Sequence, residues 1–153
     1  MEVTGSHTGV TWLAFGSRML APLGPINGLT SRIIKAAIEV HRNVGPGLLE
    51  AVYFACLVYE LRRDSLSVEC EQRLPVVYKG MTLDCHYRID LVVQAQVVVE
   101  LKAVDKVLPV HLAQLLTQLK LAHKPVGLLL NFNVPVMKEG ISRLLNKDAL
   151  PVA

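Results

Sequence analysis

Hydrophobic residues recur at helical spacing over two segments in the first half of the chain. The first segment begins near Thr30 and Ser31, either of which can cap a helix, and runs to His41. The second segment follows the Gly45-Pro46-Gly47 break and extends from Leu48 to about Arg63. The sequence therefore predicts two helices before any strand.

The spacing then changes to the alternation that is typical of extended chain, with a turn at Lys79-Gly80. The later elements are expected to be strands over 67–78, 81–93 and 97–103, a helix over 108–123, a buried strand over 125–132 and a last helix over 136–145. A helix thus crosses over between two strands in the order ααβββαβα. This order predicts an α/β (α+β) fold with a mixed central β-sheet flanked by helices.

Length and composition favour one packed domain. The chain has 153 residues, of which 52% are hydrophobic, and we expect an irregular N-terminal extension over 1–27 and a domain over 28–153. No apolar run approaches the roughly 18 residues of a membrane span, so no membrane association is expected. Three cysteines without a CxxC pair argue against disulfides and zinc, and fit a cytoplasmic protein. The net charge of +3 neither indicates nor excludes a nucleic-acid partner.

Three charged residues interrupt the apolar strands of the predicted hairpin. Glu100 and Lys102 share one face of their strand, and the hairpin would bring Asp90 beside them. Two carboxylates and an ammonium in an apolar sheet are costly unless they bind something. Mg²⁺ or Mn²⁺ and a phosphate group fit this set, and the carbonyl of Leu101 could add a further ligand. Alternatively, Glu100 and Lys102 are an exposed ion pair at a strand end.

Several motifs in order resemble one known family. Gly47-Leu48-Leu49-Glu50-Ala51-Val52-Tyr53 matches GxxExxY, and the chain over about 28–146 resembles the bacterial GxxExxY protein family, a branch of the PD-(D/E)XK nuclease superfamily. The other matching segments are Glu39-Val40-His41-Arg42, Tyr87-Arg88-Ile89-Asp90-Leu91, Glu100-Leu101-Lys102, Gln114-Leu115-Leu116 and Gly127-Leu128-Leu129-Leu130-Asn131-Phe132-Asn133.

The resemblance implies a restriction-endonuclease-like core in which Asp90, Glu100 and Lys102 form the D…ExK signature. It also implies that Glu50 adds an acid to the metal site, although Glu50 would otherwise be read as a solvated helix charge. Gln114 resembles the glutamine that follows the ExK strand in related nucleases. The tyrosine usually found four residues later is Gln118 here, and Ile89 replaces the proline of the signature.

The resulting hypothesis is a metal-dependent nuclease that hydrolyses phosphodiester bonds, with DNA as the expected nucleic-acid partner. In this hypothesis Asp90, Glu100, Leu101 and Glu50 hold Mg²⁺ or Mn²⁺, Lys102 orients the attacking water, and Gln114 supports the site. A non-catalytic module that binds nucleic acid or protein is the alternative, and a hydrolase of small phosphorylated molecules is a third. The sequence also allows a homo-oligomer. It does not determine the substrate or whether the protein is active.

Overall fold

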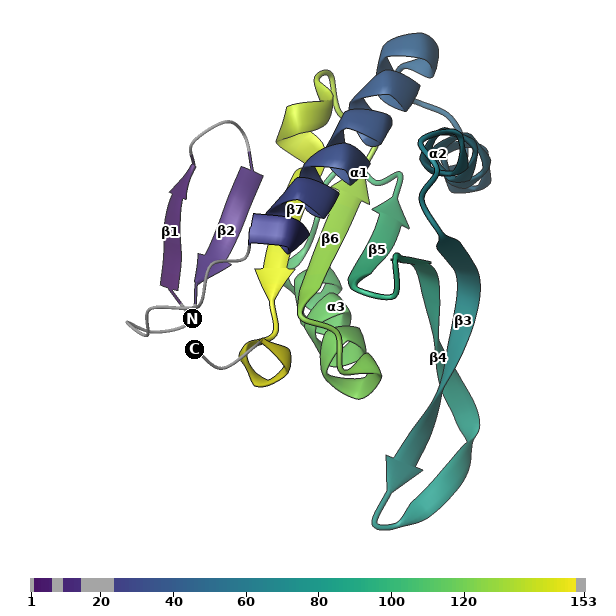
Figure 1. Ribbon diagram of the computed structural model, residues 1–153, viewed down its shortest axis with the longest axis vertical. Helices are drawn as coiled ribbons and strands as arrows, with labels where there is room; N and C mark the ends of the chain where they lie inside the picture. Colours follow the sequence, from purple (N-terminus) through teal and green to yellow (C-terminus); the bar gives the residue numbers. More distant parts are fainter. Residues whose placement is uncertain (1, 7–9, 15–23, 151–153) are drawn as a thin grey trace.

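The computed structural model describes residues 2–6, 10–14 and 24–150, which form a sheet with helices on both faces (Figure 1). Helices α1 (Gly24–Val44) and α2 (Glu50–Arg63) cover one face, and α3 (Pro109–Ala122) covers the other. None of the helices in these ranges is long and apolar enough to cross a membrane.

The sheet has the strand order β1-β2-β7-β6-β5-β4-β3. Its strands are β1 (Glu2–Ser6), β2 (Val10–Ala14), β3 (Val68–Tyr78), β4 (Met81–Val93), β5 (Val97–Lys102), β6 (Val126–Asn131) and β7 (Ile141–Leu145). The β5–β6 pair is parallel because α3 crosses between the two strands, whereas β3–β4, β4–β5 and β6–β7 are antiparallel. The predicted α+β fold with a mixed sheet flanked by helices is therefore confirmed.

The prediction of a last helix over 136–145 is wrong. Residues 136–145 form a short 3₁₀ helix, η1 (Met137–Gly140), followed by strand β7. Strand β7 pairs with β6, and this long-range pairing overrides the helical spacing of its apolar residues. Gly140 packs so closely on Asn131 that a Cβ would overlap the carbonyl oxygen of Asn131. A second short 3₁₀ helix, η2 (Lys147–Ala149), follows β7.

The N-terminal segment also differs from the expectation of irregular structure. Strands β1 and β2 lie within 1–27 and extend the sheet, because β2 pairs in parallel with β7. Helix α1 begins at Gly24, before the predicted capping residues. The boundary between an extension and a domain at residue 28 stays a prediction.

Apolar side chains alternate between two cores on opposite faces of the sheet, as the period of two in a strand requires. In β5, Val97, Val99 and Leu101 face α1 and α2, whereas Val98 faces α3 with Leu115 and Leu119. Strands β5 and β6 are buried on both faces, so they form the centre of the domain. Charged residues at the end of β5 are therefore held by a rigid element.

Strands β3 and β4 continue beyond the body of the protein as a two-stranded ribbon (Figure 1). All residues of β4 from Met81 to Arg88 are exposed, whereas Ile89 to Val93 are buried. The turn at Lys79-Gly80 has positive φ at both positions (47° and 76°), as a tight type I′ hairpin turn requires. We call residues 73–88 the arm.

Candidate metal and phosphate site

The site begins where β4 and β5 separate. Their paired residues end at Leu91 and Val99, so Asp90 and Glu100 would be the next pair in the same register. The backbones do not pair there. Instead, the Leu101 N–H donates a hydrogen bond of 2.9 Å to Oδ2 of Asp90. Asp90 is therefore fixed against β5, and only 7% of the residue is exposed.

Glu100 and Lys102 lie on the same face of β5 as Val98, as predicted from the strand period. Nζ of Lys102 is 3.6 Å from Oε1 of Glu100, and the two side chains are only 22% and 14% exposed. Oε2 of Glu100 is buried without a hydrogen-bond partner among the described residues. The alternative of an exposed ion pair is therefore wrong, because Glu100 is largely buried and one of its oxygens remains unsatisfied.

Glu50 lies in the first turn of α2, and the GxxExxY segment explains how it is held there. Gly47 has φ of 94°, a conformation that favours glycine, so the chain turns sharply before the helix. The Tyr53 hydroxyl donates to Gly45 O at 2.6 Å and accepts from Leu48 N at 3.1 Å. The buried Tyr53 ring also stacks on Phe132, with centroids 4.6 Å apart. The tyrosine thus anchors the turn that leads to Glu50.

Tyr53→Phe is expected to destabilise the protein. The ring stack is retained, but the half-buried Gly45 O and the exposed Leu48 N lose their shared partner, which costs about 1 kcal/mol of unfolding free energy, the net value of a typical hydrogen bond. The melting temperature should fall by several degrees. Tyr59→Phe is the matched control, because Tyr59 is on the same helix and 63% exposed. Equal melting temperatures for the two variants would contradict this role of the hydroxyl.

Burial and neighbouring negative charge raise the pKa values of all three carboxylates. Burial, followed by the charge of Asp90, raises the pKa of Glu100 to about 7, although Lys102 opposes the shift. Burial also raises the pKa of Asp90, against the hydrogen bond from Leu101 and the charge of Arg88. The pKa of Glu50 is raised by partial burial and by Asp90, while Lys102 and Arg88 lower it. The structure thus brings Asp90, Glu100, Lys102 and Glu50 into one electrostatic group.

Glu100→Gln is expected to stabilise the metal-free protein above neutral pH. The pKa of Glu100 in the folded state exceeds the ordinary glutamate value of 4.5, so the folded state binds more protons between about pH 4.5 and pH 7. Stability should therefore fall as pH rises through this window, and the variant should avoid that loss, which is on the order of 3 kcal/mol at most. The measurement is thermal unfolding in EDTA at about pH 5 and about pH 8.

Glu69→Gln is the control for this pH effect, because Glu69 is an exposed glutamate on β3. It should leave the pH dependence of the melting temperature unchanged. If Glu100→Gln were no more stable than wild type at the higher pH, the buried carboxylate would not be the source of the loss.

This donor set fits a small divalent ion. In the part of the chain that the structure describes, no three Asp, Glu, His or Cys side chains already form a group that could hold a metal. Mg²⁺, however, is usually held by one or two carboxylates and keeps several waters. Asp90 and Glu100 supply two carboxylates, and the unsatisfied Oε2 of Glu100 is an acceptor that a cation would satisfy. A bound Mg²⁺ or Mn²⁺ would therefore compensate the buried negative charge of this pair.

A family model described as the PD-(D/E)XK nuclease superfamily matches residues 27–144. The chain belongs to this superfamily. No curated protein and no solved structure matches it. The match includes the strand pair, α3 and β6, so the clustered Asp90, Glu100 and Lys102 are in the part of the chain that carries the family pattern.

Two residues beside the site of this superfamily member were not predicted from the sequence. Asn131, which is 2% exposed, is the register partner of Lys102, and its side chain bonds both N and O of Val104. It fixes the chain that follows Lys102, and an asparagine in an otherwise apolar strand was the available signal. Glu71 is the second residue. It has φ of 53° within β3, and its charge raises the pKa of Asp90.

The two glutamines of α3 differ in burial, and the supporting role of Gln114 stays a prediction. Gln114 is exposed on α3, whereas Gln118, one turn later, is 6% exposed and has a buried Oε1 without a partner among the described residues. Residues four apart lie on the same side of a helix. Their different burial shows that only Gln118 packs inward.

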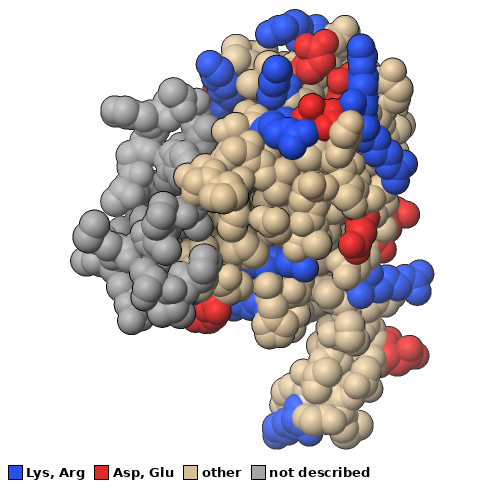
Figure 2. Space-filling model, viewed as in Figure 1, with Lys and Arg blue, Asp and Glu red and all other residues tan. Residues whose placement is uncertain are grey.

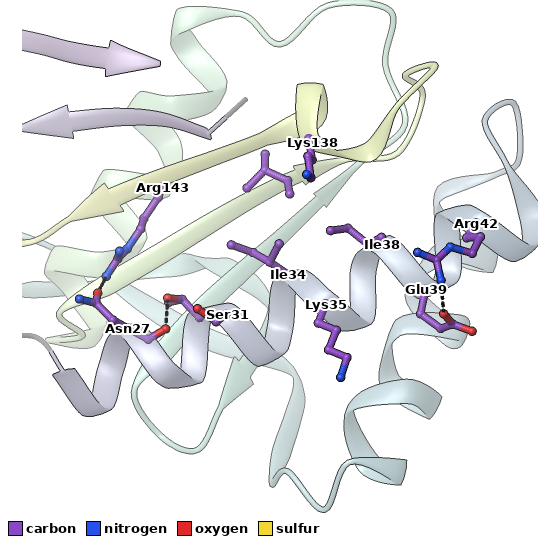
Figure 3. Close-up of a pocket in the computed structure, with 11 residues that line it drawn as sticks. Asn27, Ser31, Ile34, Lys35, Ile38, Glu39, Arg42, Lys138 and Arg143 are labelled. Atoms are coloured by element: carbon purple, nitrogen blue, oxygen red, sulfur yellow. Dashed lines mark hydrogen bonds and ion pairs between the residues drawn. The ribbon is translucent and has the colours of Figure 1, made fainter. Parts of the chain in front are cut away.

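A cavity of about 720 Å³ lies away from these carboxylates, between α1 and the segment of η1 and β7 (Figure 3). Lys35, Arg42 and Lys138 line it, and Arg42 is 3.6 Å from Glu39. Asp90, Glu100 and Lys102 are not among its lining residues. The candidate site is therefore separate from this cavity.

Proposed function

We propose that this protein is a metal-dependent nuclease that hydrolyses phosphodiester bonds of nucleic acid. The observation that carries the proposal is the buried, unsatisfied Oε2 of Glu100 beside Asp90, with the Lys102 ammonium 3.6 Å from the other oxygen of Glu100. Membership of the nuclease superfamily supports the same class of reaction.

The residues of the site have distinct roles in this proposal. Asp90 and Glu100 would hold Mg²⁺ or Mn²⁺, with the Leu101 carbonyl and Glu50 as further ligands. When bound, the ion neutralises the phosphate and lowers the pKa of a water molecule. Lys102 orients the attacking water and stabilises the charge that develops on the phosphate oxygens. The Leu101 N–H holds the Asp90 carboxylate in place, and its hydrogen bond lowers the pKa of Asp90 against the effect of burial.

The test is cleavage of labelled single- and double-stranded DNA and RNA by the purified protein with Mg²⁺ or Mn²⁺. Lys102→Ala is assayed in parallel, so that a contaminating nuclease is recognised. Cleavage by the wild type and not by the variant is expected. Binding without cleavage of any substrate would favour the non-catalytic module instead.

Finer parts of the proposal rest on the sequence motifs. We assign the chain to the GxxExxY family of bacterial proteins, with DNA as the substrate and Gln114 as a supporting residue. The three cysteines are free thiols, and we propose a reducing cytoplasm as the location of the protein. Copies of the chain could associate as a homo-oligomer, and sedimentation of the purified protein tests this.

A further inference from the structure

We infer that the arm binds the phosphate backbone of double-stranded nucleic acid through Arg73 and Arg88, next to the carboxylate site. This inference rests on the proposed nuclease function and names the form of its substrate. Its first basis is an unusual pair of like charges. Arg73 and Arg88 are direct register partners across β3 and β4, and both are exposed.

Like charges that lie directly opposite each other destabilise a strand pair. One acid is close to this pair: Oε1 of Glu71 is 3.4 Å from Nη1 of Arg88, and both side chains are about 60% exposed. An exposed ion pair of this kind contributes little. Glu71 pairs only with Arg88. Among the described residues, no ion pair involves Arg73. An anion that bridges the two arginines would remove the repulsion.

The arginine pair lies next to the carboxylate site. Arg88 precedes Asp90 by two residues on β4, so the two are about 7 Å apart along the strand. The charge of Arg88 also lowers the pKa values of Asp90 and Glu50, which shows that it acts on the site. Phosphates repeat about every 3.4 Å of helix axis along one DNA strand. Arg88 therefore lies within about two phosphates of a group bound at Asp90.

The distribution of side chains on the arm favours a duplex over a single strand. Proteins that hold single strands stack bases on aromatic side chains beside a basic groove. Here Tyr87 is next to Arg88 on β4 and so points to the opposite face, and Tyr78 lies at the end of the arm as the partner of Met81. The arginine face instead carries His86, whereas Asp84 belongs to the irregular stretch between Thr82 and His86. Around the two arginines this face offers positive charge to a backbone and no tyrosine ring.

The shape of the arm also suits a duplex. The exposed part of β4 is eight residues long and so spans about 25 Å. Figure 2 shows this ribbon projecting from the body, with basic side chains near its base and at its end and acidic side chains between them. The major groove of B-DNA admits a two-stranded ribbon. A duplex could therefore lie along the arm with one strand of its backbone over the arginines.

The test is binding of a short DNA duplex, measured in EDTA at several salt concentrations, so that a metal-dependent reaction cannot consume the probe. Arg73→Gln/Arg88→Gln should weaken binding on the order of tenfold or more and reduce the slope of log affinity against log salt by about two. Arg73→Lys/Arg88→Lys should retain most of the slope. Thermal unfolding checks that each variant folds.

Lys35→Gln/Arg42→Gln is the matched control, because it removes the same charge from exposed residues of α1 that line the cavity in Figure 3. Its affinity and salt slope should remain near those of the wild type. Equal losses in the two double variants would mean that only net charge matters, and would overturn the inference. So would wild-type binding by the arm variant, tighter binding of the single strand, or no duplex binding by the wild type.

The inference and the proposed function can fail separately. If the arm variant loses duplex affinity but the wild type cleaves nothing, the arm binds nucleic acid and the nuclease proposal is wrong. If the wild type cleaves and the arm variant binds and cleaves equally well, the nuclease proposal stands and the role of the arm is wrong.

Discussion

Lys102→Ala should lower the rate of phosphodiester cleavage by about 10²-fold or more, the size of effect expected when one group that stabilises developing charge is lost. Lys102 is placed for this role because its side chain is largely buried beside Glu100 at the end of a rigid strand. The measurement is the initial cleavage rate of a labelled substrate at saturating metal. Affinity for nucleic acid should fall much less, because it is shared among many phosphate contacts.

Lys106→Ala is the control for this variant. Lys106 is an exposed residue in the loop after β5. Its loss removes the same charge four residues from Lys102 but leaves every residue of the site in place. Its cleavage rate should stay within a few-fold of the wild type. A Lys102→Ala protein that cleaves at the wild-type rate would show that another group orients the water, or that a contaminant is responsible.

Asp90→Asn should abolish the stabilisation of the protein by Mg²⁺ or Mn²⁺. A ligand that binds only the folded state at 100 times its Kd contributes about 2.7 kcal/mol, so the wild type should melt at a clearly higher temperature with metal. The variant loses an anionic ligand, yet its amide oxygen can still accept the hydrogen bond from the Leu101 N–H. Loss of the metal effect is therefore expected without loss of the fold.

Asp84→Asn provides the comparison, since Asp84 is an exposed aspartate on the same strand. It should respond to metal as the wild type does. An equal metal-induced rise in melting temperature for wild type and Asp90→Asn would place the ion elsewhere on the protein. Thermal unfolding at a series of metal concentrations, with EDTA as reference, measures all three proteins.

The central part of the fold could be predicted because its signals are local. The alternation in β4, the short apolar run in β5 and the helical spacing of α3 are each set within a few residues. Strand β7 could not be predicted in this way, because its apolar residues fit a helix as well as a strand. Its partner β6 decides between the two. Gly140 was the one local warning, since a glycine within a helix is unfavourable and here the chain needs the space.

The candidate site also has a part that follows from local geometry and a part that depends on long-range pairing. Glu100 and Lys102 share a face because they are two residues apart, and a hairpin brings Asp90 close, so their grouping follows from strand geometry. The register of β3 against β4 cannot be read from composition, and so neither the pairing of Arg73 with Arg88 nor the position of Glu71 was evident. The burial that raises the pKa of Glu100 to about 7 also requires the packed structure.

The two cores distribute stability unevenly along the sheet. Strands β5 and β6 are buried on both faces, so their amides exchange with solvent only when the domain unfolds as a whole. The arm has almost no buried apolar surface, so its hydrogen bonds can open locally at a small cost in free energy. The arm can therefore bend and change its twist to follow the curvature of a bound molecule, while Glu100 and Lys102 keep their positions on β5.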